Sequence, residues 1–88
     1  MSYNYQEQRP RIFTEDGQVM FLKIRDKAHE LINSSGVVMS CKLMSATTGD
    51  TWMMTACMDR LVELGELREI PNTYSNWGQH RIFIGADI

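Results

Sequence analysis

The sequence predicts a single α+β domain in which three helices precede a small antiparallel sheet. Three observations predict this class. The chain has 88 residues, of which 43% are apolar, and this is enough for one small hydrophobic core. Residues 16–33 and 51–64 carry apolar side chains at helical spacing. After Gly65 the pattern changes to two short runs typical of strands, at 66–70 and 79–84.

The first helix is expected over residues 16–33. Thr14 offers an N-cap, and Glu15 and Asp16 place negative charge in the first turn, where the helix dipole favours it. Gly36 suits a left-handed C-cap. At about 100° per residue, the apolar side chains expected in the core share one arc. They are Met20, Phe21, Ile24, Ala28, Leu31 and Ile32.

The middle of the chain predicts a short strand, a brief helix and a tight turn. Residues 37–39 have strand-like character and are expected to pair with one edge of the hairpin. Ser40 is a fitting N-cap for a second helix over about 41–47. Gly49 suits a turn with positive φ, and Asp50 caps the next helix. This arrangement is a helix, a turn and a helix.

The third helix, over residues 51–64, is expected to bury one face. Its predicted core positions lie within a narrow arc. They are Met54, Cys57, Met58, Leu61 and Leu64. The two strands that follow form a hairpin with an eight-residue loop.

We expect a disordered N-terminal arm at 1–10, a folded domain at 11–85 and a C-terminal tail at 86–88. The longest apolar run, residues 19–22, is far shorter than the roughly 18 residues of a membrane-spanning helix. The polar start lacks the basic and apolar stretches of a secretory signal. We therefore expect a cytoplasmic protein without a membrane partner.

The sequence carries no pattern of an enzyme, a cofactor site or a metal site. The soft ligands His29, His80, Cys41 and Cys57 show no CxxC, HxxxH or HExxH spacing. GxSxG, P-loop and GxGxxG motifs are absent as well. We therefore expect no catalytic residues, no cofactor and no metal.

The order of elements, with particular residues, resembles the winged helix-turn-helix superfamily. These residues are Leu43, the turn 48–50, the segment 59–65 with sequence DRLVELG, and Leu67 with Arg68. The resemblance covers about residues 12–85, and the chain is similar to small bacterial or prophage winged-helix proteins. It implies a DNA-binding protein of transcriptional regulation, with the third helix in the major groove and the hairpin as a wing on the flanking DNA.

The candidate DNA contacts are polar or cationic side chains of the second helix, the third helix and the wing. They are Lys42, Thr51, Thr55, Arg60, Arg68 and Arg81. We expect Arg68 and Arg81 on one face of the hairpin, where they and Arg60 would neutralise a few phosphates. The alternative is that these arginines pair with neighbouring carboxylates, Arg60 with Glu63 or Asp59 and Arg68 with Glu69 or Glu66.

Charge argues for a second hypothesis, a protein-interaction module. Nine Lys and Arg against eleven Asp and Glu give a net charge of −2, whereas nucleic-acid-binding domains are typically strongly basic. The candidate protein contacts are acidic or aromatic residues, with one Met. They are Trp52, Met53, Asp59, Glu63, Tyr74 and Trp77. A continuous positive surface would favour DNA, and an apolar one a protein. We expect a monomer or a weak homodimer through Leu22, which lies off the core stripe.

Overall fold

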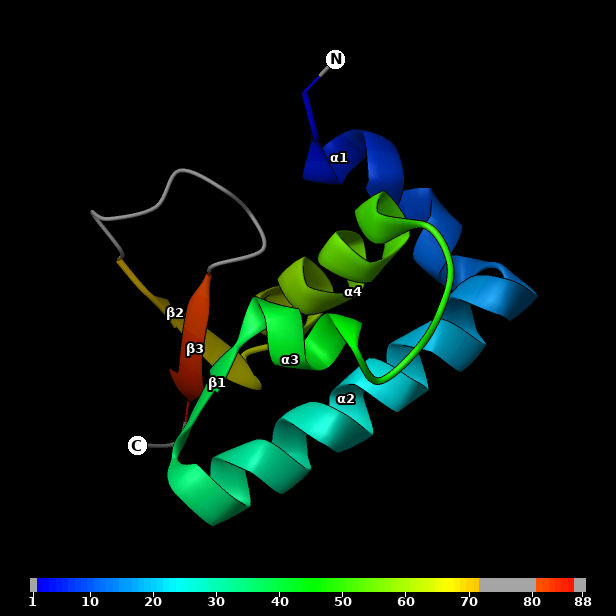
Figure 1. Cartoon of the computed structure of the whole chain (residues 1–88). Helices are drawn as coiled ribbons and strands as arrows, with labels where there is room; N and C mark the ends of the chain where they lie inside the picture. The colour runs from blue at the N-terminus through cyan, green and yellow to red at the C-terminus, as the bar shows by residue number, and fades with distance from the viewer. Residues whose placement is uncertain (1, 72–80, 87–88) are drawn as a thin grey trace.

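The computed structural model describes residues 2–71 and 81–86. Within these ranges the chain forms four α-helices, one 3-10 helix and a three-stranded antiparallel sheet, which confirms the predicted α+β class. Figure 1 shows the sheet to one side of the helices, with the long α2 (Glu15–Ser35) lying along α3 (Ser40–Met44) and α4 (Thr51–Glu63). In the described residues, no helix combines the length and the apolar character that crossing a bilayer requires.

Helix α2 begins and ends at the predicted signals. The Thr14 hydroxyl accepts a hydrogen bond from the Gly17 amide at 3.1 Å, and Gly36 ends the helix with φ of 78°. Met20, Phe21, Ile24 and Ala28 are buried as expected, and Leu31 and Ile32 are partly buried against the same core. At Gly17 a side chain has no room, because a Cβ atom would lie 2.0 Å from the carbonyl oxygen of Arg11.

Helix α3 is shorter than the 41–47 predicted for it. It ends at Met44 because the Ser45 hydroxyl donates to the Lys42 carbonyl at 2.7 Å and so competes with the helical ladder. In the turn that follows, Gly49 has the expected positive φ, 132°. Asp50 then caps α4, accepting hydrogen bonds from the amides of residues 52 and 53 at 2.7 and 3.3 Å.

Helix α4 buries most of its predicted core face. Met54, Cys57, Met58 and Leu61 are buried, whereas Leu64 is 45% exposed and its predicted burial is wrong. The helix ends at Glu63, Leu64 is its C-cap, and the chain reverses at Gly65 with φ of 77°, so Leu64 lies at the open end of the helix. Ala56 is also fully buried, and both α1 and η1 contact α4.

The sheet has the strand order β1-β3-β2. Its strands are β1 (Val37–Met39), β2 (Leu67–Ile70) and β3 (Ile82–Gly85). Strand β1 pairs with β3, with Val38 opposite Phe83 and both side chains buried, so the predicted pairing of 37–39 with the hairpin edge is confirmed. Most of the predicted hairpin loop, 71–78, lies outside the described residues, as does most of the tail at 86–88.

Residues 2–10, the described part of the predicted disordered arm, are ordered. They form α1 (Tyr5–Gln8) and lead into the 3-10 helix η1 (Arg9–Phe13). The Asn4 side chain caps α1, accepting from the amides of residues 6 and 7, and Ile12 is buried in the core at 1% exposure. Figure 1 shows α1 next to α4. The polar side chains that suggested disorder instead form hydrogen bonds with α4.

Candidate interaction surface on helix α4

The outer face of α4 is the part of the fold on which both functional hypotheses depend. We define the α4 face by its four outward side chains, which are Trp52, Thr55, Asp59 and Glu63. In the structure this face is occupied by the chain itself. Residues 2–9, called here the N-terminal strap, contact it through hydroxyl, guanidinium and aromatic groups.

Among the strap residues, Tyr3 contacts the middle of the α4 face, at Asp59. Its hydroxyl donates to a carboxylate oxygen of Asp59 at 2.6 Å, and its ring meets the ring of Trp52 edge to face, with centroids 6.4 Å apart. Burial, the hydrogen bond to Asp59 and the negative charge of Asp59 together raise the pKa of Tyr3 above its ordinary value. The hydroxyl therefore keeps its proton and remains a donor.

Glu63 accepts hydrogen bonds from two further strap residues, Tyr5 and Arg9, and from Arg60 of α4. The Tyr5 hydroxyl donates to it at 2.9 Å, Arg9 Nε at 3.0 and 3.2 Å, and Arg60 at 2.7 Å. The hydrogen bond from Arg60, followed by those from Tyr5 and Arg9, lowers the pKa of Glu63 to about 2. Burial and the contact with Glu63 raise the pKa of Tyr5 to about 12. Glu63 is thus an ionised acceptor shared by the strap and α4.

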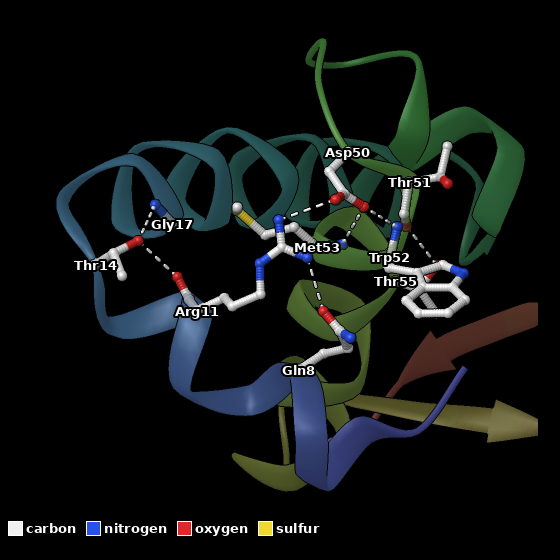
Figure 2. A network of polar contacts seen from close by, with 9 residues as sticks. All are labelled: Gln8, Arg11, Thr14, Gly17, Asp50, Thr51, Trp52, Met53 and Thr55. Carbon is white, nitrogen blue, oxygen red and sulfur yellow. Dashed lines mark hydrogen bonds and ion pairs between the residues drawn. The ribbon is translucent and has the colours of Figure 1, made fainter. Parts of the chain in front are cut away.

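The beginning of α4 is tied to η1 through Arg11. Figure 2 shows its guanidinium between two acceptors, the amide oxygen of Gln8 at 2.7 Å and a carboxylate oxygen of Asp50 at 2.9 Å. Asp50 also caps α4, and the hydrogen bonds from Arg11 and from the Trp52 amide lower the pKa of this carboxyl. One carboxylate therefore joins η1 to the first turn of the helix.

Arg81 neutralises the α4 face from the side of the sheet. Its guanidinium lies 2.6 Å from Asp59 and 2.8 Å from Glu69, and its side chain is only 18% exposed. The group also stacks over the ring of Phe83, 5.1 Å from the centroid. Burial alone would lower the pKa of Arg81, but hydrogen bonds to Glu69 and Asp59 raise it above its ordinary value. Arg81 therefore connects α4 to the sheet through its ion pairs with Asp59 and Glu69.

The cationic cluster expected from Arg60, Arg68 and Arg81 does not form in the described part of the chain. Arg60 pairs with Glu63, as the alternative interpretation had it. Arg68 and Arg81 lie on opposite faces of the hairpin, so the prediction that they share one is wrong. In the register of β2 and β3, Arg68 pairs with Ile84. Arg81 instead hydrogen bonds to Glu69, the residue after Arg68 on β2. Because neighbouring residues of a strand point to opposite faces, Arg81 lies on the face opposite Arg68.

The remaining candidates are separated from one another. Lys42 and Arg68 are exposed and have no ion pair among the described residues. Lys42 lies on α3, which follows the edge strand β1, whereas Arg68 lies on β2, the opposite edge strand of the sheet. The expected partners of Arg68 are engaged elsewhere, Glu69 with Arg81 and Glu66 with Arg25. These cations therefore supply isolated charges.

The candidates on the first turns of α4 are only partly accessible. Thr51 is exposed, and the half-buried Thr55 donates its hydroxyl to the Thr51 carbonyl at 2.8 Å. Trp52 and Met53 are half-buried, so they do not form an open apolar surface. Tyr74 and Trp77 lie outside the described residues.

The described residues offer little further chemistry. No group of three or more His, Cys, Asp and Glu side chains is placed to hold a metal ion within 2–71 and 81–86. Cys57 is buried, which raises the pKa of its thiol to about 12, and Cys41 is exposed. His29 lies 2.8 Å from Glu66, which Arg25 also contacts.

Tyr3 and Tyr5 of the strap were not among the functional residues predicted from the sequence, and Arg9 was expected in a disordered arm. One local signal pointed to α1: Asn4 followed three residues later by Glu7 is a pattern that begins helices. A second signal was the complementary chemistry of an N-terminal segment with hydroxyl and guanidinium groups and a third helix with outward carboxylates. Neither signal identifies the partner of each side chain, because these residues are more than 50 positions apart.

Comparison of the chain with protein-family models, with curated proteins and with solved structures found no match. The contacts of α4 are therefore the basis of the functional proposal.

Proposed function

We propose that the chain is a winged-helix domain that acts as a protein-interaction module through the α4 face. The order of helix, strand, helix, helix and two strands, with β1 joined to the far strand of the hairpin, supports the winged-helix assignment. One observation carries the function. The α4 face already holds a peptide segment, the strap, through two tyrosine hydroxyls and one arginine.

Charge on the α4 face supports a protein partner over DNA. Asp59, Glu63 and Glu69 contribute three negative charges, and Arg9, Arg60 and Arg81 contribute three positive ones, each of which is already paired with a carboxylate. A phosphate backbone approaching this surface would have to compete with these carboxylates for each of the three arginines. DNA binding and transcriptional regulation stay predictions for this chain.

A titration with unrelated duplex DNA at low salt separates the two functions. The native chain and the variant Asp59→Asn, Glu63→Gln are compared, because removing two carboxylates from a DNA-binding surface must strengthen binding. We expect no measurable binding by either protein. A gain of affinity in the double variant, lost again when Arg60 and Arg81 are replaced by Ala, would show that α4 binds DNA.

A photoreactive amino acid at position 55 of α4 tests for the partner directly. The matched control is the same group at position 30 of α2, where Glu30 is exposed and far from α4 in the sequence. We expect a crosslinked protein from position 55 alone. The identified partner, once purified, must bind the native chain and lose at least about tenfold in affinity with Asp59→Asn, Glu63→Gln. Equal binding to both proteins would exclude the α4 face.

A further inference from the structure

We propose that the N-terminal strap is a displaceable cover of the α4 face, and that the partner replaces it with a segment carrying arginine and tyrosine side chains. This inference rests on the proposed function, because it names the chemistry and the regulation of the same surface. Three observations support it: the strap is held mainly by side chains near the surface, its release would leave acceptors and an aromatic ring on α4, and Phe13 offers a place for an arginine.

The strap is attached by side chains near the surface. Its three long-range polar contacts are Tyr3 to Asp59, Tyr5 to Glu63 and Arg9 to Glu63, and all of these residues are half-buried or exposed. Residues 2–7 contribute no fully buried side chain, and the rings of Tyr3 and Tyr5 pack against the core while staying only partly buried. Segments held by few buried contacts and by exposed hydrogen bonds open locally while the rest of a domain stays folded.

The attachment becomes firmer from Gln8 onward, because Gln8 is buried. Ile12 is 1% exposed within the core, and its carbonyl accepts from the side chain of Gln18 at 2.7 Å. Arg11 is tied to Asp50 at 2.9 Å (Figure 2). The firmly held residues begin at Gln8, which is buried and accepts a hydrogen bond from Arg11 at 2.7 Å. Residues 2–7 can therefore leave α4, and the Arg9 side chain can swing away from Glu63, while Gln8 and the backbone of η1 remain in place.

Release of the strap would expose acceptors and aromatic rings together. Asp59 keeps Arg81, and Glu63 keeps Arg60, but both carboxylates lose a tyrosine hydroxyl. Trp52 loses its edge-to-face contact with the ring of Tyr3. The vacated surface thus needs donors and an aromatic ring from its next occupant.

The exposed ring of Phe13 favours arginine over lysine as the cation that binds this surface. The ring is 50% exposed and belongs to η1, so it stays when the strap leaves. The guanidinium groups of Arg9 and Arg60 both lie over it, each 5.2 Å from the centroid. When the Arg9 side chain swings away, its position between Phe13 and Glu63 suits another arginine, which would stack on the ring and pair with the carboxylate.

An NMR titration of the full chain tests this exchange. The probe is the acetylated peptide SYNYQEQRPR, the sequence of residues 2–11, and the control peptide has Ala in place of both tyrosines and of the first arginine. The native chain is compared with Tyr3→Phe, Tyr5→Phe, Arg9→Ala, a variant that keeps both rings and so protects the fold. We expect the peptide to shift α4 amides in both proteins, with about tenfold higher affinity in the variant, because its strap competes less. Adding Asp59→Asn, Glu63→Gln should abolish the shifts.

Two outcomes would overturn the exchange. Equal affinity of the native chain and the strap variant, or no shift of α4 amides in either, would mean that the strap is a fixed part of the fold. A native dimer in sedimentation that the strap variant loses would mean that the occupant is the strap of a second copy. Neither outcome bears on the crosslink from position 55, so the exchange can fail while the interaction module stands. A gain of DNA affinity would instead refute the module itself.

Discussion

The hydroxyl of Tyr3 donates a 2.6 Å hydrogen bond to Asp59, a residue 56 positions later in the chain. This contact joins the start of the chain to the middle of α4. Since Asp59 also receives Arg81 at 2.6 Å, the same carboxylate connects the strap, the helix and the sheet. The accessibility of α4 to any partner therefore depends on a side chain outside the helix.

Replacing Tyr3 with Phe should loosen the strap. The substitution keeps the ring beside Trp52 and removes only the hydroxyl, so Asp59 loses one donor. We expect the free energy of unfolding to fall by about 1 kcal/mol, a value reduced for the partial exposure of the pair. Urea denaturation measures this change, and hydrogen exchange should quicken in residues 5–8. Tyr3→Ala, which also loses the ring contact, should cost more, and a Phe variant as stable as the native chain would contradict the role of the hydroxyl.

Leu61→Ala should destabilise the whole domain. Leu61 is fully buried in the α4 core, so the substitution removes apolar contacts and leaves a cavity, at a cost of about 2–5 kcal/mol. Leu64→Ala is the matched control on the same helix end, because Leu64 is 45% exposed. It should change stability by no more than about 0.5 kcal/mol. Equal shifts of the thermal midpoint in the two variants would refute this assignment of the core.

Acid should release the strap. Contacts with Arg60, Tyr5 and Arg9 lower the pKa of Glu63 from 4.5 to about 2, so folding favours its ionised form. A carboxyl with a lowered pKa stabilises the fold fully above its unfolded value, and this contribution is lost as pH falls through the folded value. The contribution of Glu63 should therefore disappear between 4.5 and about 2.

NMR resonances of Tyr5 and Arg9 followed through this pH range measure the release. In Glu63→Gln the side chain cannot titrate, so the acid-dependent change of these resonances should be greatly reduced. An unchanged titration curve in that variant would assign the acid response to another carboxyl.

Association should be weak and should depend on α2. Leu22 is 50% exposed and Val19, one turn earlier, is 52% exposed, so the helix carries a small uncovered apolar surface. An apolar surface of this size supports at most a weak dimer. Sedimentation at micromolar concentration should give a monomer or a weak dimer that Leu22→Glu abolishes. A tight dimer that survives this substitution would place the interface elsewhere.

Local patterns in the sequence determined most of the secondary structure. The caps at Thr14 and Asp50, the helical spacing of α2 and α4, and the left-handed Gly36 all lie where the sequence predicted them. The pair between Arg60 and Glu63 was also foreseeable, because residues three apart on a helix are neighbours. Each of these features depends on residues only a few positions apart.

Only the tertiary structure decided the character of the α4 face. Whether residues 2–9 are disordered or ordered depends on Asp59 and Glu63, which the chain brings to Tyr3 and Tyr5 only when it folds. The face on which Arg81 lies depends on the register of β2 and β3, and a shift of one residue would turn that side chain over. Periodicity predicts which side of an element is polar, but it does not name the distant residue that satisfies each charge. For that physical reason the sequence predicted a free acidic helix face, and the folded chain covers it.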